Sequence, residues 1–263
     1  MIGVKSHTVL LFVVFVGILG LSFFGLMLGD IPTEFSDLYP ALLDYSSQDI
    51  NQVIIREIRL PRIMMAIVSG AALSVAGMLM QTLFQNPLAG PYVLGINSGS
   101  SLMVALGVLS GVGFFNSELG LIGSALLGAF VFGLFILFTA SFLRNQIGLL
   151  LFGVMLGSFV SAIITILEAG SQAEALKSFA LWSMGSLNNA TVEQIPMIFS
   201  VFIITCFLTF FIIKPLNILV LGEEECRLMG YDIKKIRILI VFITALFTGL
   251  ITAFCGPIAF VGL

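Results

Sequence analysis

The sequence predicts an all-α polytopic membrane protein, and its composition, its long apolar runs and its few charges lead to that fold class. Of the 263 residues, 59% are hydrophobic and 10% are charged. A soluble globular domain carries about 25% charged residues, so this chain cannot cover a folded surface with polar groups in water. Several apolar runs reach about 20 residues, the length at which a helix crosses the roughly 30 Å hydrocarbon core of a bilayer. We therefore expect residues 1–263 to form a single transmembrane domain.

Seven runs are apolar and long enough to be transmembrane helices, and they cover residues 9–29, 61–84, 93–112, 119–143, 147–168, 195–213 and 236–255. Two long connections, 30–60 and 169–194, and a connection of mixed charge, 214–235, join some of these runs. If the N-terminus is cytoplasmic, seven Lys and Arg residues lie inside and four lie outside. Because cytoplasmic connections carry the excess of Lys and Arg, we expect a cytoplasmic N-terminus.

The chain lacks the motifs that catalysis, ATP binding or ion coupling would need. It contains neither the P-loop sequence GxxxxGK[ST] nor HExxH, so we expect no catalytic residue, no cofactor and no metal site. No Lys or Arg lies at the centre of an expected span, which argues against an ion-coupled transporter. Cys206, Cys226 and Cys255 form no CxxC pair and are interpreted as packing residues. A net charge of −3 without a basic face argues against nucleic acid as a partner.

The stretch QNPLAGPYVLG, residues 85–95, predicts a corner between two spans. Pro61 is expected in the first turn of the preceding helix, where its missing N–H costs nothing. Residues before proline avoid the helical region, so Asn86 and Gly90 are pushed into extended or turn geometry. Non-helical backbone at membrane depth must be buried in protein or face water. The side chains expected to satisfy the freed backbone groups are Gln81, Gln85, Asn86 and Asn97.

Small residues recur four apart in several runs. One stripe contains Gly120, Ser124 and Gly128, and another contains Gly153, Gly157, Ser161 and Thr165. Such stripes let helix backbones approach closely in a membrane. For the second stripe the spacing leaves two interpretations open, tight helix packing or the wall of a substrate path.

The order of these motifs resembles one known family. RLPR (59–62), GAALSVAGMLMQ (70–81) and QNPLAGPYVLGINSGSS (85–101) closely resemble the permease family of ABC importers for iron-siderophores, haem and vitamin B12, the FecCD or BtuC type. The family's motif residues here are Gln81, Asn86, Pro87, Pro91 and Gly95. Further stretches match in the family's order: 149–167, 181–187, 216–237 and 256–263. The resemblance therefore runs from about residue 50 to the last residue.

The resemblance implies a type II ABC importer permease fold of about ten spans, about seven of them within this chain. Two permease copies would flank a central path, as a homodimer or a heterodimer. ATPase subunits, which bind the ATP, would dock below, and a substrate-binding protein would dock above. Arg59 and Arg62 fall on positions that meet carboxylates of the binding protein. The fifth span lines the path in this family, which favours the path interpretation for Gly153, Gly157, Ser161 and Thr165.

By the same resemblance, residues 216–230 form the cytoplasmic coupling segment that contacts the ATPase. Its residues are Gly222, Glu223, Glu224, Arg227 and Gly230. The two glycines bracket EEECRLM, which is long enough for about two helical turns, and glycine permits a sharp bend at each end. Acidic residues in the first turn suit the helix dipole. Cys226 and Met229 depart from the small residue and the leucine that are usual there.

The substrate is less defined than the fold. Ferric siderophore is the commonest expectation for this family, haem and cobalamin are alternatives, and the expected location is the bacterial cytoplasmic (inner) membrane. The sequence stops at Leu263, where family members continue with a Pro-His signature and three more spans, so an inactive truncated remnant stays open as an alternative. A passive channel or ion-coupled transporter is the competing class. It predicts buried charge or a matching inverted half, and the sequence contains neither pattern.

Overall fold

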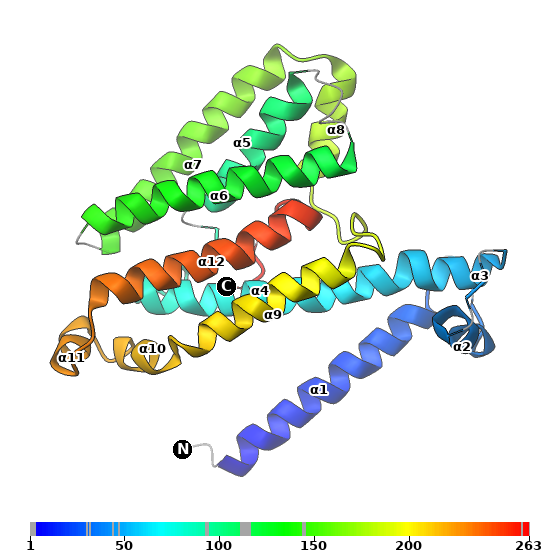
Figure 1. The fold of residues 1–263 in the computed structure, drawn as a ribbon, viewed down its shortest axis with the longest axis horizontal. Coiled ribbons are helices and arrows are strands. Elements are labelled where there is room, and N and C mark those ends of the chain that lie inside the picture. The colour runs from blue at the N-terminus through cyan, green and yellow to red at the C-terminus, as the bar shows by residue number, and fades with distance from the viewer. Residues whose placement is uncertain are drawn as a thin grey trace. The chain divides into compact units, whose positions relative to one another are not determined.

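The computed structural model describes residues 4–29, 31, 33–43, 45–46, 48–92, 95–110, 117–143, 146–258 and 260–262 (Figure 1). Within these ranges the regular structure is entirely helical, which confirms the predicted all-α class. The contacts divide the chain into two compact units. Unit 1 contains residues 1–67 and 190–195, and unit 2 contains residues 68–189 and 196–263.

Unit 1 consists of an apolar helix followed by short helical segments. Its elements are α1 (Val4–Met27), α2 (Phe35–Leu43), α3 (Ile50–Val53), the π-helix η1 (Ile54–Arg59) and the first turns of α4 (Leu60–Phe84). A small core joins Leu38 and Ala41 of α2 to Ile55 of η1, and Leu26 and Met27 pack against it. From Thr8 to Phe24 most side chains of α1 are exposed, as expected of a helix whose solvent is lipid.

The helix that contains Pro61 begins earlier than the sequence predicts. Residues Ile50–Phe84 form one helical stretch of 35 residues, so Pro61 lies inside a helix rather than at its start. The backbone N–H of Leu60 donates to the carbonyl of Ile55, five residues back, which is the π-helical pattern. We attribute the continuity of the helix through Pro61 to this wider turn. The turn ends at Leu60, directly before the proline, and the proline has no N–H to donate.

Unit 2 is a bundle of longer helices. It holds the rest of α4, then α5 (Ile96–Leu109), α6 (Glu118–Phe142), α7 (Gln146–Ala169), α8 (Ala173–Ser183), all but the first residue of α9 (Ile195–Phe210), α10 (Ile213–Leu219), α11 (Glu223–Leu228) and α12 (Ile233–Cys255). Figure 1 shows α6 running beside α12, and α5 and α7 lying together, in agreement with the contacts between these pairs. α12 is the most enclosed apolar helix, with 72% of its apolar window buried.

Small residues form the closest contacts in unit 2. Gly128 of α6 packs directly against the backbone of Gly99 of α5, so that a Cβ at Gly128 would overlap it. A Cβ at Gly249 of α12 would lie 2.9 Å from Cβ of Ala129. The hydroxyl of Ser100 donates to the carbonyl of Ala125 at 2.9 Å. Close packing and interhelical hydrogen bonds thus join these helices, as they do in membranes generally.

Each of the seven apolar runs coincides with a helix, but two differ from the expected span. Among the described residues, five helices are long and apolar enough to cross a membrane. The run 195–213 breaks after Phe210, and α9 and α10 are bent by 58°. Residues 93, 94, 111 and 112 of the expected span 93–112 lie outside the described residues. Within that run α5 has 14 residues and begins directly after Gly95, whose φ of 78° is left-handed. The long connections are also partly helical, since they contain α2, α3, η1 and α8.

Candidate functional site

The predicted coupling segment contains a short helix held between two glycine turns. Gly222, with φ 138°, precedes α11, and Gly230, with φ 83°, follows it. The N–H of Gly230 donates to the carbonyl of Arg227 at 2.9 Å, and the N–H of Tyr231 donates to that of Cys226 at 3.1 Å. These two bonds make a Schellman motif, in which a left-handed glycine ends the helix. The segment is therefore a defined helical turn with fixed ends.

The two sides of α11 differ in exposure. The side chain of Cys226 is fully buried, whereas Leu228 is 88% exposed and Met229, just after the helix, is 68% exposed. Burial, together with the negative charge of Glu223, raises the pKa of the Cys226 thiol, so this cysteine serves as a neutral packing residue. α11 thus packs through Cys226 and presents apolar side chains outward.

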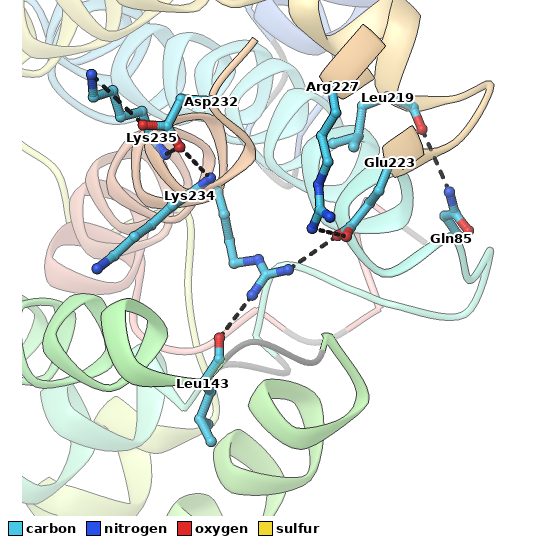
Figure 2. A network of polar contacts seen from close by, with 9 residues as sticks. Gln85, Leu143, Leu219, Glu223, Arg227, Asp232, Lys234 and Lys235 are labelled. Carbon is cyan, nitrogen blue, oxygen red and sulfur yellow. Dashed lines mark hydrogen bonds and ion pairs between the residues drawn. The ribbon is translucent and has the colours of Figure 1, made fainter. Parts of the chain in front are cut away.

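An ion-pair network attaches α11 to two other helices. Glu223 Oε1 lies 3.1 Å from an Nη atom of Arg237, and Glu223 Oε2 lies 3.8 Å from an Nη atom of Arg227. The other Nη atom of Arg237 donates to the carbonyl of Leu143 at 2.8 Å. Figure 2 shows Arg227 and Leu143 at opposite ends of this network, with Glu223 between them. The loops after α6 and before α12 therefore lie at the same end of unit 2.

Sequence reasoning assigned no role to Arg237, although a signal was present. Arg237 follows Ile233 by four residues and precedes Ile240 by three, so the three share one helix face. All three are buried, while Lys234 and Lys235 are exposed. The side chain of Arg237 is 6% exposed. The sequence feature that marks Arg237 is therefore a cation whose spacing places it on the apolar face of a helix.

The corner between α4 and α5 is closed by its own side chains. The amide of Gln81 donates to the carbonyl of Pro87 at 3.0 Å, and Asn86 Oδ1 accepts from the N–H of Leu88 at 2.9 Å. Pro91 is buried, and Gly95, with φ 78° and ψ 10°, precedes the first residue of α5. Asn97 does not take the role expected of it, because its Oδ1 is buried without a donor from the described residues.

Gln85 contacts the coupling segment, residues 216–230, from this corner. Its φ of 48° is left-handed, which is uncommon outside glycine. Its amide nitrogen lies 3.5 Å from the carbonyl oxygen of Leu219 at the end of α10 (Figure 2). That distance is at the weak limit of a hydrogen bond. The corner and the end of α10 are thus neighbours within unit 2.

The small-residue stripe of α7 divides into two parts. A Cβ on Gly95 would lie 3.3 Å from the carbonyl oxygen of Gly153, and a Cβ on Gly157 would lie 3.3 Å from Ser98 Oγ, so these two glycines pack against the start of α5. Ser161 and Thr165 are exposed, and the Thr165 hydroxyl donates to the carbonyl of Ser161 at 3.0 Å. Only this second part of the stripe is exposed.

Arg59 and Arg62, both in unit 1, have different environments. Arg59 is 8% exposed and donates to the carbonyls of Leu26 and Met27 at 2.7 and 3.1 Å and to Thr33 Oγ1 at 2.8 Å, and it also bonds the carbonyl of Ile31. It thereby satisfies carbonyls at the end of α1, where a cation also complements the helix dipole. Arg62 is exposed. Arg59 is therefore engaged within the chain, whereas the side chain of Arg62 is exposed.

The described residues contain no group of three or more His, Cys, Asp or Glu side chains that could hold a metal ion. The three cysteines are free thiols; Cys226 and Cys255 are buried and Cys206 is half-buried.

Comparison with known proteins agrees with the motifs. The FecCD transport family model matches residues 13–263. The chain is 36% identical over 230 residues to the hemin transport system permease protein HmuU of Yersinia pestis, covering 86% of this chain and 68% of that protein. It is 35% identical to the vitamin B12 import system permease protein BtuC of Klebsiella pneumoniae, covering 81% and 63%. It is 30% identical to the ferric enterobactin transport system permease protein FepG of Escherichia coli, covering 91% and 72%.

A solved structure, described as a metal-chelate type ABC transporter in an inward-facing conformation, matches with a TM-score of 0.83 and 28% identity. The match covers 96% of this chain and 78% of that one. The chain spans about two thirds of the length of the curated relatives it matches. These likenesses, together with the multi-span helical fold, show that the chain belongs to the FecCD transport family of ABC importer permeases.

Proposed function

We propose that this chain is the transmembrane permease subunit of an ATP-powered importer that moves a ferric siderophore across the bacterial cytoplasmic membrane. The observation that carries this proposal is α11, a helix held between two glycine turns and tied by ion pairs to membrane-spanning helices. The chain has no P-loop sequence, so a separate ATPase subunit would bind and hydrolyse ATP. This polypeptide would perform no chemistry and would change accessibility when the ATPase closes.

The exposed side of α11 has the character of a docking surface. Leu228 and Met229 present apolar area, and Glu224 and Arg227 add charges of both signs. An apolar centre with a polar rim is the usual composition of a protein interface. Because both ends of α11 are fixed, a displacement of α11 by the ATPase would be transmitted to the permease helices rather than absorbed by a flexible loop.

A second permease copy would complete the path beside α7. Only 17% of the apolar window of α7 is buried within this chain, although the helix is long enough to span the membrane. We propose that Ser161 and Thr165 face the path between two copies, and that Gly153 and Gly157 position α7 against α5. Homodimer and heterodimer are both compatible with this arrangement.

The binding protein would dock at the opposite face, through Arg62. With a cytoplasmic N-terminus, the predicted topology puts Arg62 on the outer side of the membrane. An exposed arginine suits a carboxylate partner, with which it forms charge-assisted hydrogen bonds. Since Arg59 is occupied in capping α1, the docking proposal is confined to Arg62.

Haem or cobalamin is the second candidate for the substrate. A relative 36% identical to this chain is a hemin permease, and one 35% identical is a vitamin B12 permease. All of these candidates are bulky chelates, which suit a path with small side chains. The permease itself carries few groups that would distinguish them.

Co-purification with an ATPase subunit of this importer family from the same organism tests the importer assignment. Capture from detergent-solubilised membranes is expected for the unsubstituted chain. It should be lost in Gly230→Pro, because proline cannot adopt φ 83°. Lys235→Gln is the matched control and should retain capture. Failure of the unsubstituted chain to retain the ATPase would overturn the assignment.

Uptake into cells that lack their own importers tests the substrate. The chain would be expressed with its ATPase and binding protein, and cells would be offered ferric desferrioxamine B, haemin or cyanocobalamin. ATP-dependent uptake of the ferric hydroxamate alone supports the siderophore proposal. Uptake of haemin or cyanocobalamin alone replaces it with the second candidate.

A further inference from the structure

We propose that Arg237 is a positioning residue that joins α11 to α6 and α12, so that a displacement of α11 by the ATPase moves these membrane-spanning helices with it. This inference rests on the proposed function, because it assumes that the ATPase acts on α11. It adds a specific transmitting residue, which lies outside the segment 216–230.

The geometry of Arg237 brings three separate elements together. Arg237 lies in the second turn of α12, Glu223 is the first residue of α11, and Leu143 is the C-cap of α6. One Nη atom meets Glu223 Oε1 at 3.1 Å, and the other donates to the Leu143 carbonyl at 2.8 Å. The planar guanidinium, with its several donors in a rigid fork, can hold both partners at once. A lysine ammonium is a single point charge on a flexible stem.

Burial distinguishes this pair from the other ion pairs nearby. The side chain of Arg237 is 6% exposed and that of Glu223 is 28% exposed, so solvent screens this pair less than it screens exposed pairs. In contrast, Arg227 is 70% exposed, and Lys235, paired with Asp232 at 3.7 Å, is 85% exposed. Those two pairs stay within one helix or its cap and are screened by solvent. Arg237 alone among these cations connects different elements.

The helices that Arg237 joins are packed to move together. α12 meets α6 where Gly249 faces Ala129, and α6 meets α5 where Gly128 faces Gly99. At these two contact points close packing favours a joint shift of the helices over a continuous deformation. A cavity of about 300 Å³ opens beside the first of them and is lined by Ala129 and Gly249, among others. From α5 the contact continues to α7 through Ser98 and Gly157. A continuous series of contacts therefore leads from α11 to the helix that carries Ser161.

The test measures nucleotide-driven movement without using a transported substrate. A Ser161→Cys reporter is placed on α7, and Cys206 is changed to Ser so that only the buried Cys226 and Cys255 remain. The permease with its ATPase subunits is placed in lipid nanodiscs. The rate of labelling by a charged maleimide is compared with and without ATP plus vanadate. We expect the nucleotide to change the rate by at least about fivefold, the lower end of typical coupling between sites.

Arg237→Gln is expected to reduce this rate change strongly, without removing all of it, while the ATPase subunit still co-purifies. Arg237→Lys should retain the ATPase but give a reduced change, because an ammonium cannot hold Glu223 and Leu143 as the fork does. Lys235→Gln is the matched control: it removes a cation two residues away that reaches no other helix, and it should leave the change intact. Thermal unfolding of each variant is measured in the same nanodiscs.

A double-mutant cycle separates transmission from a general loss of stability. If Arg237 acts through Glu223, the double variant Glu223→Ala with Arg237→Gln should lose no more than the Arg237 variant alone. A full rate change in Arg237→Gln, or strictly additive losses in the double variant, overturns the inference and leaves the proposed function standing. Loss of the ATPase from Arg237→Gln also overturns it, since the residue would then only shape α11. If the unsubstituted chain retains no ATPase, the proposed function and this inference fail together.

Discussion

Arg59 donates from its guanidinium to the carbonyl oxygen of Leu26 at 2.7 Å, across 33 residues of sequence. The arginine thus closes the end of α1 from a helix that comes much later in the chain. Gly29 permits the approach, because a Cβ there would lie 2.6 Å from one Nη atom of Arg59.

Arg59→Ala should destabilise unit 1, because it leaves the carbonyls of Leu26 and Met27 without a charged donor in a buried site. Hydrogen bonds to charged groups contribute about 1.5–3 kcal/mol, and we expect a loss in that range. Thermal unfolding in detergent, followed by circular dichroism, measures it. Arg62→Ala is the control and should change stability by less than about 0.5 kcal/mol, since Arg62 is exposed. Equal losses in the two variants would contradict the capping role.

Arg62→Glu should weaken binding of the substrate-binding protein, because it places a like charge opposite the proposed carboxylate. Truncating or reversing one member of a hydrogen-bonded charge pair costs about 2–5 kcal/mol when the pair is desolvated, and less at an exposed rim. Surface plasmon resonance at two salt concentrations measures the change. Arg62→Lys should retain most of the affinity and the salt dependence. Undiminished binding by Arg62→Glu would remove Arg62 from the docking surface.

Gly128→Ala should destabilise the packing of α5 on α6, because the new Cβ would overlap the backbone of Gly99. A single added methyl that forces a backbone shift costs about 1–3 kcal/mol. Gly123→Ala, on the same helix, is the matched control, since a Cβ there meets no atom within 4 Å. Both variants would be compared by thermal unfolding. If Gly128→Ala were as stable as Gly123→Ala, the close approach would not be required.

Cys226 should make the permease less stable at alkaline pH. The pKa of its thiol is raised in the folded chain, first by burial and then by Glu223. The unfolded chain, with an ordinary thiol pKa of about 8.5, loses its proton first as pH rises. The contribution of Cys226 to the free energy of unfolding is therefore fully present below the pKa of the unfolded chain and declines as pH rises above it. Unfolding temperatures measured from pH 7 to about pH 10 should fall less in Cys226→Ala than in the unsubstituted chain; parallel curves would contradict the assignment.

Helix positions were predictable because a span must be apolar and about 20 residues long in lipid. All seven expected runs contain a helix, and the corner at residues 85–92 lies where Pro87 and Pro91 predicted it. The start of this helix at Ile50, well before Pro61, was not predictable, since a π-turn depends on the backbone before the proline rather than on a residue code. The position at which α5 begins depends on how many residues the corner occupies, and no local sequence pattern predicts that number.

For the candidate site, the two glycine turns of α11 could be read from sequence, because a left-handed residue strongly favours glycine. The difference in burial between Arg59 and Arg62 could not be predicted from the sequence. The two arginines stand in one short motif, but burial depends on the end of α1, about 30 residues away in sequence. The packing of Gly153 and Gly157 likewise depends on α5, which the spacing within α7 does not reveal.

The sequence by itself determined that lipid is the solvent of this chain, where its helices run, that it carries no P-loop, and which family its motifs resemble. These properties follow from composition, run length and local backbone preference, which act within a few residues. Only the tertiary structure decided which of the cations are buried and what they join. Arg237 stands beside two lysines in sequence, yet it alone reaches Glu223 and Leu143, because a side chain's partners are set by segments that approach from elsewhere in the chain.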